Sequence, residues 1–282
     1  MVAEKGRLVR VGDAGQWAGS LPHVDLFLKP LRGAGGRGAE RWDFDPPQGY
    51  HDANGNVLSE AQLVERLERL SQTKSYVLRP RVVNHPAIAD LSNGALTTVR
   101  VMTCPDEQGA IEVCAAVFRM AQGHNTVVDN FHAGGIVAGV DVRTGQLGRG
   151  VDGGKFGHGT GWHETHPDTG APILGRTLPM WQEVLELVKE AHAEAFADQA
   201  IIGWDVALTG DGPALVEGNK GPCVDLLQRP AGGPLGNSRL GELLAFHLGL
   251  AVEAKYTGAA APGADPREPE DRRVASSRTV KV

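Results

Sequence analysis

The order of the predicted strands and helices is the sequence feature that most constrains the fold. Three strand pairs are each joined by a short stretch that contains glycine, and amphipathic helices lie between the pairs. Short turns join antiparallel strands, whereas parallel strands need a long crossover. The sequence therefore predicts an α+β fold rather than a doubly wound parallel sheet. The predicted pairs are 96–104 with 111–120, 136–142 with the strand after Gly145, and 201–208 with 214–219.

Apolar residues recur at helical spacing in three segments, and each segment begins with a residue that favours a helix start. Outside these segments, a strand is predicted over 24–31. The run 76–83 is rich in β-forming residues, but Pro80 within it favours an edge strand or a connector. The predicted helices are 59–71 with a capping box of Ser59 and Gln62, 179–197 opened by Pro179, and one from Asn237 or Ser238 to about Leu250.

Composition and charge exclude several classes of function. The 282 residues suffice for one or two domains, and the net charge of −6 offers no electrostatic reason for a nucleic-acid partner. No apolar run approaches the roughly 18 residues of a membrane span, and the N-terminus MVAEKGRLVR lacks the apolar segment of a secretory signal. Three widely spaced cysteines, Cys104, Cys114 and Cys223, favour buried, reduced thiols. We therefore expect a cytoplasmic protein with no nucleic-acid or membrane partner.

The stretch LFLKPLRGAGGRGAERW contains Gly33-x-Gly35-x-x-Gly38, the spacing of a dinucleotide-binding fingerprint. That fingerprint must open a helix, but the following AERWDFDPPQGYHD has two prolines and no apolar stripe. A Walker A loop is also excluded, because Lys29 precedes the glycines. A glycine hairpin that covers a triphosphate remains, with a flexible surface turn as the alternative. Its candidate phosphate-binding residues are Lys29, Arg32, Gly33, Gly35, Gly36, Arg37 and Gly38.

The hairpin GWDVALTGDGPALVEGNKGP, residues 203–222, carries acidic residues among apolar ones. A turn centred on Asp211 puts Asp205 opposite Glu217, and Val206 opposite Val216. Glu217 and Asn219 are two residues apart and share one face of a strand. Three oxygen ligands then converge, and Mg²⁺ prefers such ligands together with substrate phosphates. A solvent-facing edge hairpin with acidic decoration is the alternative.

These two segments and five others resemble one family in the same order along the chain. FLKPLRGAGGRG and GWDVALTGDGPALVEGN look like the nucleotide-binding core of the ATP-grasp superfamily. The whole set resembles its sugar-transfer associated branch, sometimes described as α-L-glutamate-ligase-like, over roughly residues 24–250. The other segments are YVLRPRVVNHPAIADLS, LTTVRVMT, FRMAQGHNTVVDNFHAGGIVAGVD, HPDTGAPILG and PMWQ.

The resemblance implies an ATP-grasp fold, in which two α+β subdomains clasp ATP. The expected division is 1–82 for the glycine-loop subdomain with a short extension, 83–254 for the metal- and substrate-binding subdomain, and 255–282 for a disordered tail. Many ATP-grasp enzymes carry a separate N-terminal domain before the LFLKP-like strand. Only about 25 residues precede that strand here. We therefore expect that domain to be absent, with a partner protein as a candidate replacement.

The resemblance also implies roles for single residues. Lys29 and the glycine loop would cover the phosphates, and the run from Arg79 to Val83 would pass the adenine ring. The implied ATP-binding residues are Lys29, Arg32, Gly33, Gly35, Gly36, Gly38, Arg79, Arg81 and Val82. Asp205, Glu217 and Asn219 match the ligands of Mg²⁺, with Mn²⁺ as a substitute.

Four further residues are implied in catalysis. Arg100 and Arg119 are candidates for the transferred phosphoryl group or the acceptor carboxylate, with a surface ion pair as the alternative for each. Asn130 belongs to a segment that resembles a family loop near the γ-phosphate. Lys220 directly follows the metal motif and would reach the substrate.

The implied activity is an ATP- and Mg²⁺-dependent ligase that activates a carboxylate as an acylphosphate and couples it to an amine-type nucleophile. The carboxylate and the nucleophile would be small molecules or carrier-bound groups. Two alternatives remain open: a phosphotransferase on the same fold, and a nucleotide-binding subunit without turnover. The long loop 150–176 holds His158, His163 and His166, which favour a substrate-facing or plain exposed loop over a zinc site.

Overall fold

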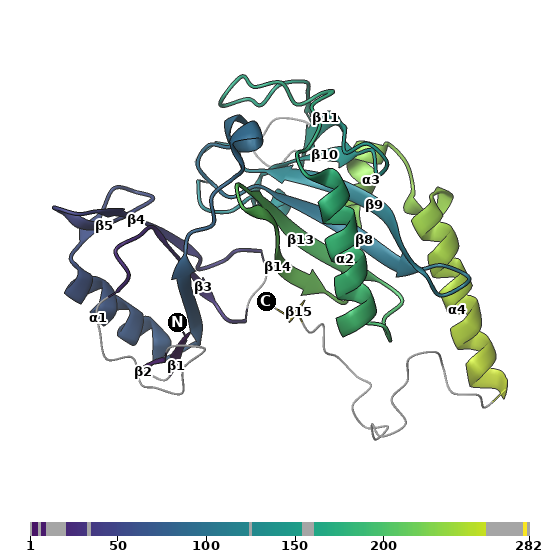
Figure 1. Cartoon of the computed structure of the whole chain (residues 1–282), viewed down its shortest axis with the longest axis horizontal. Helices are drawn as coiled ribbons and strands as arrows, with labels where there is room; N and C mark the ends of the chain where they lie inside the picture. Colours follow the sequence, from purple (N-terminus) through teal and green to yellow (C-terminus); the bar gives the residue numbers. More distant parts are fainter. Residues whose placement is uncertain are drawn as a thin grey trace.

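The computed structural model describes residues 2–4, 7–9, 21–32, 35–123, 126–153, 161–257 and 279–280. Two antiparallel sheets lie next to each other, and the chain completes most of the first before it builds the second (Figure 1). This arrangement confirms the predicted α+β class, because every strand pair in the described ranges is antiparallel. Within those ranges, no helix combines the length and the apolar character needed to cross a membrane.

The N-terminal sheet has the strand order β2-β1-β7-β3-β4-β5-β6. Helix α1 (Glu60–Ser71) packs Leu63 and Leu67 against its core face. The predicted capping box is present, since Gln62 N donates to Ser59 Oγ at 3.3 Å and Ser59 N donates to Gln62 Oε1 at 2.9 Å. The strands are β1 (Val2–Glu4), β2 (Arg7–Val9), β3 (Leu26–Pro30), β4 (Glu40–Asp45), β5 (Gly49–Asp52), β6 (Val57–Leu58) and β7 (Tyr76–Pro80).

Strand β7 corrects one prediction. It lies inside the sheet between β1 and β3, not at an edge. Pro80 is tolerated because it is the last residue of the strand, and β1 pairs only with Tyr76 and Val77. The missing N–H therefore falls outside the pairing with β1.

The C-terminal sheet has the order β12-β11-β10-β9-β8-β13-β14-β15 and contains the three predicted hairpins. Helix α2 (Trp181–Ala195) covers one face, where Val184 and Val188 join a core with Phe118 and Trp204. Helices α3 (Asp225–Ala231) and α4 (Arg239–Thr257) cover part of the other face. The strands are β8 (Thr98–Pro105), β9 (Ile111–Met120), β10 (Ile136–Val140), β11 (Leu147–Asp152), β12 (Trp162–His163), β13 (Ile202–Thr209), β14 (Gly212–Asn219) and β15 (Thr279–Val280).

Three helix ends differ from the predictions. Helix α2 ends at Ala195 and not at residue 197. Helix α2 begins at Trp181, because Met180 takes a left-handed conformation with φ 53° and the chain turns into the helix only there. Helix α4 continues to Thr257, past the predicted end near Leu250. It thus extends into the segment predicted as a disordered tail. Residues 258–278 and 281–282 of that segment lie outside the described residues.

A buried hydrogen-bond chain links α2 to the C-terminal sheet. Trp204 Nε1 donates to Thr103 Oγ1 at 2.8 Å, and Thr103 Oγ1 lies 2.7 Å from His192 Nδ1. His192 Nε2 donates to the carbonyl of Gln199 at 3.0 Å. Burial lowers the pKa of His192 below its ordinary value, which favours the neutral ring at pH 7.5; Nε2 then carries the proton and Nδ1 accepts from the Thr103 hydroxyl.

This chain predicts an acid-sensitive stability. The unfolded chain protonates His192 near pH 6.5 while the folded protein resists, so the free energy of unfolding should fall as the pH drops below about 6.5. In His192→Gln, the decrease in the free energy of unfolding that is due to His192 should be absent. Urea unfolding at pH 7.5 and 5.5 measures the free energy of unfolding of both proteins. An equal decrease in the variant and the parent would contradict the assignment of His192 as a buried, neutral ring.

Candidate functional site

A cavity of about 300 Å³ lies between the two sheets. Its walls come from β3, β4 and β7 on one side, from β13 and β14 on the other, and from the segment 81–96 that connects the sheets. The lining is mostly apolar, with Phe27, Val82 and Leu96 among the side chains. Four cations border it: Lys29, Arg41, Arg79 and Arg81. An apolar slot with a few convergent charges is typical of a site for a flat, anionic ligand.

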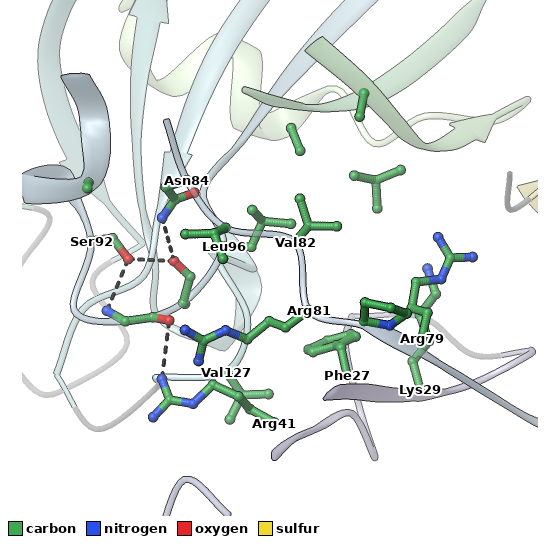
Figure 2. A pocket seen from close by; sticks show the side chains of 18 of the residues that line it. Phe27, Lys29, Arg41, Arg79, Arg81, Val82, Asn84, Ser92, Leu96 and Val127 are labelled. Carbon is green, nitrogen blue, oxygen red and sulfur yellow. Dashed lines mark hydrogen bonds between the residues drawn. The ribbon is translucent and has the colours of Figure 1, made fainter. Parts of the chain in front are cut away.

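Strand alternation explains why these cations face the cavity. On β3, Leu26 and Leu28 enter the core against α1, so Phe27 and Lys29 lie on the opposite face. On β7, Leu78 is likewise buried, and Arg79 lies opposite Phe27 in the ladder. Figure 2 shows Lys29 and Arg79 at one end of the cavity, with Arg41 and Arg81 extending toward Ser92 at the other.

The cavity contains four of the predicted ATP-binding residues: Lys29, Arg79, Arg81 and Val82. Arg41 also lines it, and our sequence analysis missed this residue. The signal was available, because buried Trp42 in a strand with period two puts Arg41 on the opposite face.

Arg41 and Arg81 are tied to acidic partners. Arg81 pairs with Asp43 at 2.5 Å and with Asp25 at 3.5 Å. Arg41 pairs with Asp43 at 3.3 Å and also donates to the carbonyls of Gly94 and Thr126, both at 3.2 Å. Arg41 therefore connects the N-terminal sheet with two loops of the other subdomain.

The glycine loop lies against the second subdomain. Gly35, Gly36 and Gly38 have φ of 70°, 68° and 78°, a region that favours glycine. Asn130 Nδ2 donates to the carbonyl of Gly35 at 3.0 Å. A Cβ at Gly36 would lie 2.8 Å from Val128 Cγ1. Asn130 thus anchors the loop. Arg32 is exposed, and Gly33 lies outside the described residues.

The acidic hairpin has the predicted pairing at its functional end and a different pairing nearer the turn. Asp205 lies opposite Glu217, as predicted. The turn, however, is one residue shorter than predicted, since Thr209 pairs with Gly212. A bulge on β14 compensates, so Val206 lies opposite Leu215 and not Val216. The predicted pairing of Asp205 with Glu217 is confirmed because the shorter turn and the bulge offset each other.

Arg100, Arg119, Asp129 and Asp205 form a buried charged cluster on one face of the C-terminal sheet. Arg100 Nε donates to Asp205 Oδ1. Arg119 donates to Asp205 Oδ2 at 2.9 Å and to Asp129 Oδ1 at 2.6 Å. The Thr98 hydroxyl donates to Asp129 Oδ2 at 2.6 Å. The alternative of surface ion pairs for the arginines is wrong, because both guanidinium groups are buried.

Burial and ion pairing have opposite effects on the pKa values of the two aspartates in this cluster. Burial disfavours the ionised form of Asp205, but Arg119 and Arg100 outweigh it and hold the pKa of Asp205 below its ordinary value. For Asp129, burial prevails over Arg119 and Thr98, so its pKa lies above the ordinary value. Arg119 Nε is buried without a hydrogen-bond partner. One donor of Arg119 is therefore unsatisfied, which is rare for a buried polar group.

The predicted metal ligands are Asp205, Glu217 and Asn219, and their donor atoms suit a hard cation. Glu217 lies opposite Asp205. The amide nitrogen of Asn219 donates to the carbonyl of Gly203 at 3.2 Å, so the amide oxygen is the atom that Asn219 would offer to a cation. The donor set is therefore all oxygen, as Mg²⁺ prefers. Both carboxylate oxygens of Asp205, however, already accept from guanidinium groups. Ala207, two residues from Asp205 on the same face, lines the cavity and links it to this cluster.

The structure does not bring every predicted residue to this site. The Lys220 ammonium lies 5.5 Å from the centre of the Phe196 ring, which belongs to the core on the α2 face. Lys220 is thus directed away from Asp205. His163 pairs with Asp152 at 2.9 Å, and buried His166 contacts the carbonyl of Ala121 at 2.9 Å. These two histidines have separate partners, and His158 lies outside the described residues.

The glycine-loop contact predicts a steric effect at Gly36. Gly36→Ala should strain the left-handed backbone and push against Val128, displacing the loop. We expect nucleotide affinity to fall about tenfold, which corresponds to roughly 1.4 kcal/mol. Titration calorimetry with ATP measures it. Gly55→Ala is the matched control, because Gly55 has φ 83° but no atom within 4 Å of an added Cβ. Equal affinity of the two variants would contradict the loop assignment.

The comparison with known families agrees with this geometry. A family model described as sugar-transfer associated ATP-grasp matches residues 13–239. No curated protein matches the chain in a sequence search. The match includes the glycine loop, the cavity, the buried charges and the acidic hairpin. The chain therefore belongs to the sugar-transfer associated ATP-grasp family.

Proposed function

We propose that the protein is an ATP- and Mg²⁺-dependent ligase that activates a carboxylate as an acylphosphate and couples it to an amine-type nucleophile. Membership of an ATP-grasp family supports ATP-dependent ligase or kinase chemistry in general. The observation that carries the proposal is the position of the cavity. It lies between the two sheets, and two of its lining residues lead to the other parts of the proposed site. Val127 lies three residues before Asn130, which contacts the glycine loop, and Ala207 lies two residues after Asp205, which pairs with the two buried arginines.

In this proposal the cavity binds ATP, with the adenine ring between the apolar side chains of Val82 and Leu96. Lys29 neutralises the phosphates from the N-terminal sheet. The glycine loop covers them and excludes water, which protects an acylphosphate from hydrolysis. The hydrogen bond from Asn130 to the loop would hold the loop in this closed position.

Phosphoryl transfer needs alignment and charge neutralisation more than covalent help. A carboxylate oxygen of the acceptor attacks the γ-phosphorus, the bond to the β-phosphate oxygen breaks, and ADP leaves. Arg119 and Arg100 stabilise the negative charge on the transferring oxygens. Asp205, Glu217 and Asn219 would hold Mg²⁺, which supplies further positive charge for the phosphates. The amine nitrogen then attacks the acyl carbon, loses a proton, and phosphate leaves.

A screen tests the reaction class. Carboxylic acids and amines are incubated in pairs with the protein and ATP, and ADP release is followed by a coupled assay. A ligase gives free phosphate and an amide of the two partners in mass spectra. A phosphorylated hydroxyl acceptor without free phosphate would instead show a kinase, and would overturn the proposal.

The metal assignment predicts the effect of a single-atom change. Glu217→Gln removes a carboxylate oxygen and should reduce ATP turnover with the true acceptor by about 100-fold, with the fold intact by circular dichroism. Asp211→Asn is the matched control, because Asp211 is exposed at the turn of the same hairpin. It should retain the parent rate. Near-normal turnover in Glu217→Gln would exclude Glu217 as a ligand.

A further inference from the structure

Three side chains of metal-binding type meet close to Asn130, which contacts the glycine loop. They are His132 of the short helix η2 (Phe131–Ala133), and Cys223 and Asp225 at the start of α3. Their ligand atoms all lie within 4.8 Å of one another. In the part of the chain that the structure describes, this is the one group of three such residues. We had predicted Cys223 as a buried thiol, but it is exposed.

The three side chains point at a common position. His132 Nε2 and Asp225 Oδ2 are 2.8 Å apart. The Cys223 thiol donates to Asp225 Oδ1 at 2.8 Å. Leu226 N also donates to Asp225 Oδ1, at 2.7 Å, which fixes the carboxylate. One carboxylate thus holds an imidazole and a thiol at the spacing of ligands around one ion.

The surrounding structure orients the imidazole. Asn130 Oδ1 accepts from His132 N at 3.2 Å, and the His132 ring packs edge-on against Phe131 with 5.6 Å between ring centroids. Phe131 is itself buried in the core under α3. The side chains of His132 and Asp225 remain 44% and 46% exposed, so an additional ligand could approach the group from solvent.

The cluster adjoins the site described above on two sides. Asn130, whose side chain accepts from the backbone N–H of His132, also donates to the carbonyl of Gly35 in the glycine loop. Pro222, next to Cys223, packs over the sheet: a Cβ at Gly203 would lie 2.5 Å from Pro222 Cβ and 3.3 Å from Arg100 Cδ.

We propose that His132, Cys223 and Asp225 bind a borderline-soft divalent cation of the Zn²⁺ class. A thiolate and an imidazole prefer Zn²⁺ over Mg²⁺, so this site differs in chemistry from the all-oxygen set of Asp205, Glu217 and Asn219. On binding, the Cys223 thiol releases its proton to solvent and its sulfur becomes a ligand. Three protein ligands with an open fourth position suit a site that accepts water or a substrate oxygen. The inference does not depend on the ligase reaction.

Metal binding by the full chain tests it. Zn²⁺ alone is titrated into the reduced protein by calorimetry, and Co²⁺ is added in a separate titration to detect thiolate-to-cobalt charge-transfer absorption. The parent should bind one tight Zn²⁺ and show the absorption. Cys223→Ser and His132→Ala should each weaken Zn²⁺ binding at least about tenfold. Cys114→Ser and His23→Ala are matched controls that change a thiol and an exposed imidazole elsewhere, and should bind as the parent does.

A ligand replacement keeps the test decisive if a variant folds poorly. Cys223→His retains a metal ligand, so it should still bind Zn²⁺ but lose the thiolate absorption with Co²⁺. The inference is overturned if the parent binds Zn²⁺ no more tightly than Cys223→Ser, or if the thiolate absorption survives in Cys223→His.

Discussion

The pairing of Arg100 and Arg119 with Asp205 and Asp129 is the constraint on which the C-terminal subdomain depends. An uncompensated charge at this depth would cost about 3–5 kcal/mol, so each charge requires its partners. The four charges come from β8, β9, β13 and the segment before η2. They meet only in the observed register, in which Asp205 lies opposite Arg100 and Thr98 opposite Arg119. The cluster therefore helps to specify the strand register.

The face of the C-terminal sheet that bears Asp205 has an apolar half and a polar half. The half with Met102, Val117 and Val137 is apolar and is covered by α3 and α4. The half with Asp205 and the arginines is polar, and Ala207 on the same face continues into the cavity between the sheets. Helices cover the apolar half, where their apolar side chains find partners. The polar half adjoins a cleft where an anionic ligand would find donors.

The two subdomains meet through polar contacts at the rims of the cleft. Arg41 reaches the carbonyls of Gly94 and Thr126, and Asn130 holds the glycine loop at Gly35. Each contact is a hydrogen bond to a backbone carbonyl and is worth little individually, about 1 kcal/mol. Contacts of this strength tie the two sheets together only weakly. The proposed Zn²⁺ site lies close to the contact made by Asn130.

Local periodicity sufficed to predict the hairpins, the capping box at Ser59, and the shared face of Glu217 and Asn219, because alternation and turn chemistry act within a few residues. The pairing of Asp205 with Glu217 was also predictable, although the bulge beside Val206 was not. Tertiary packing alone placed β7 inside its sheet, directed Lys220 toward Phe196, and brought His132 to Cys223 and Asp225. Such neighbours come from segments far apart in the chain. No local pattern encodes them, since they depend on how whole sheets and helices bury their apolar faces.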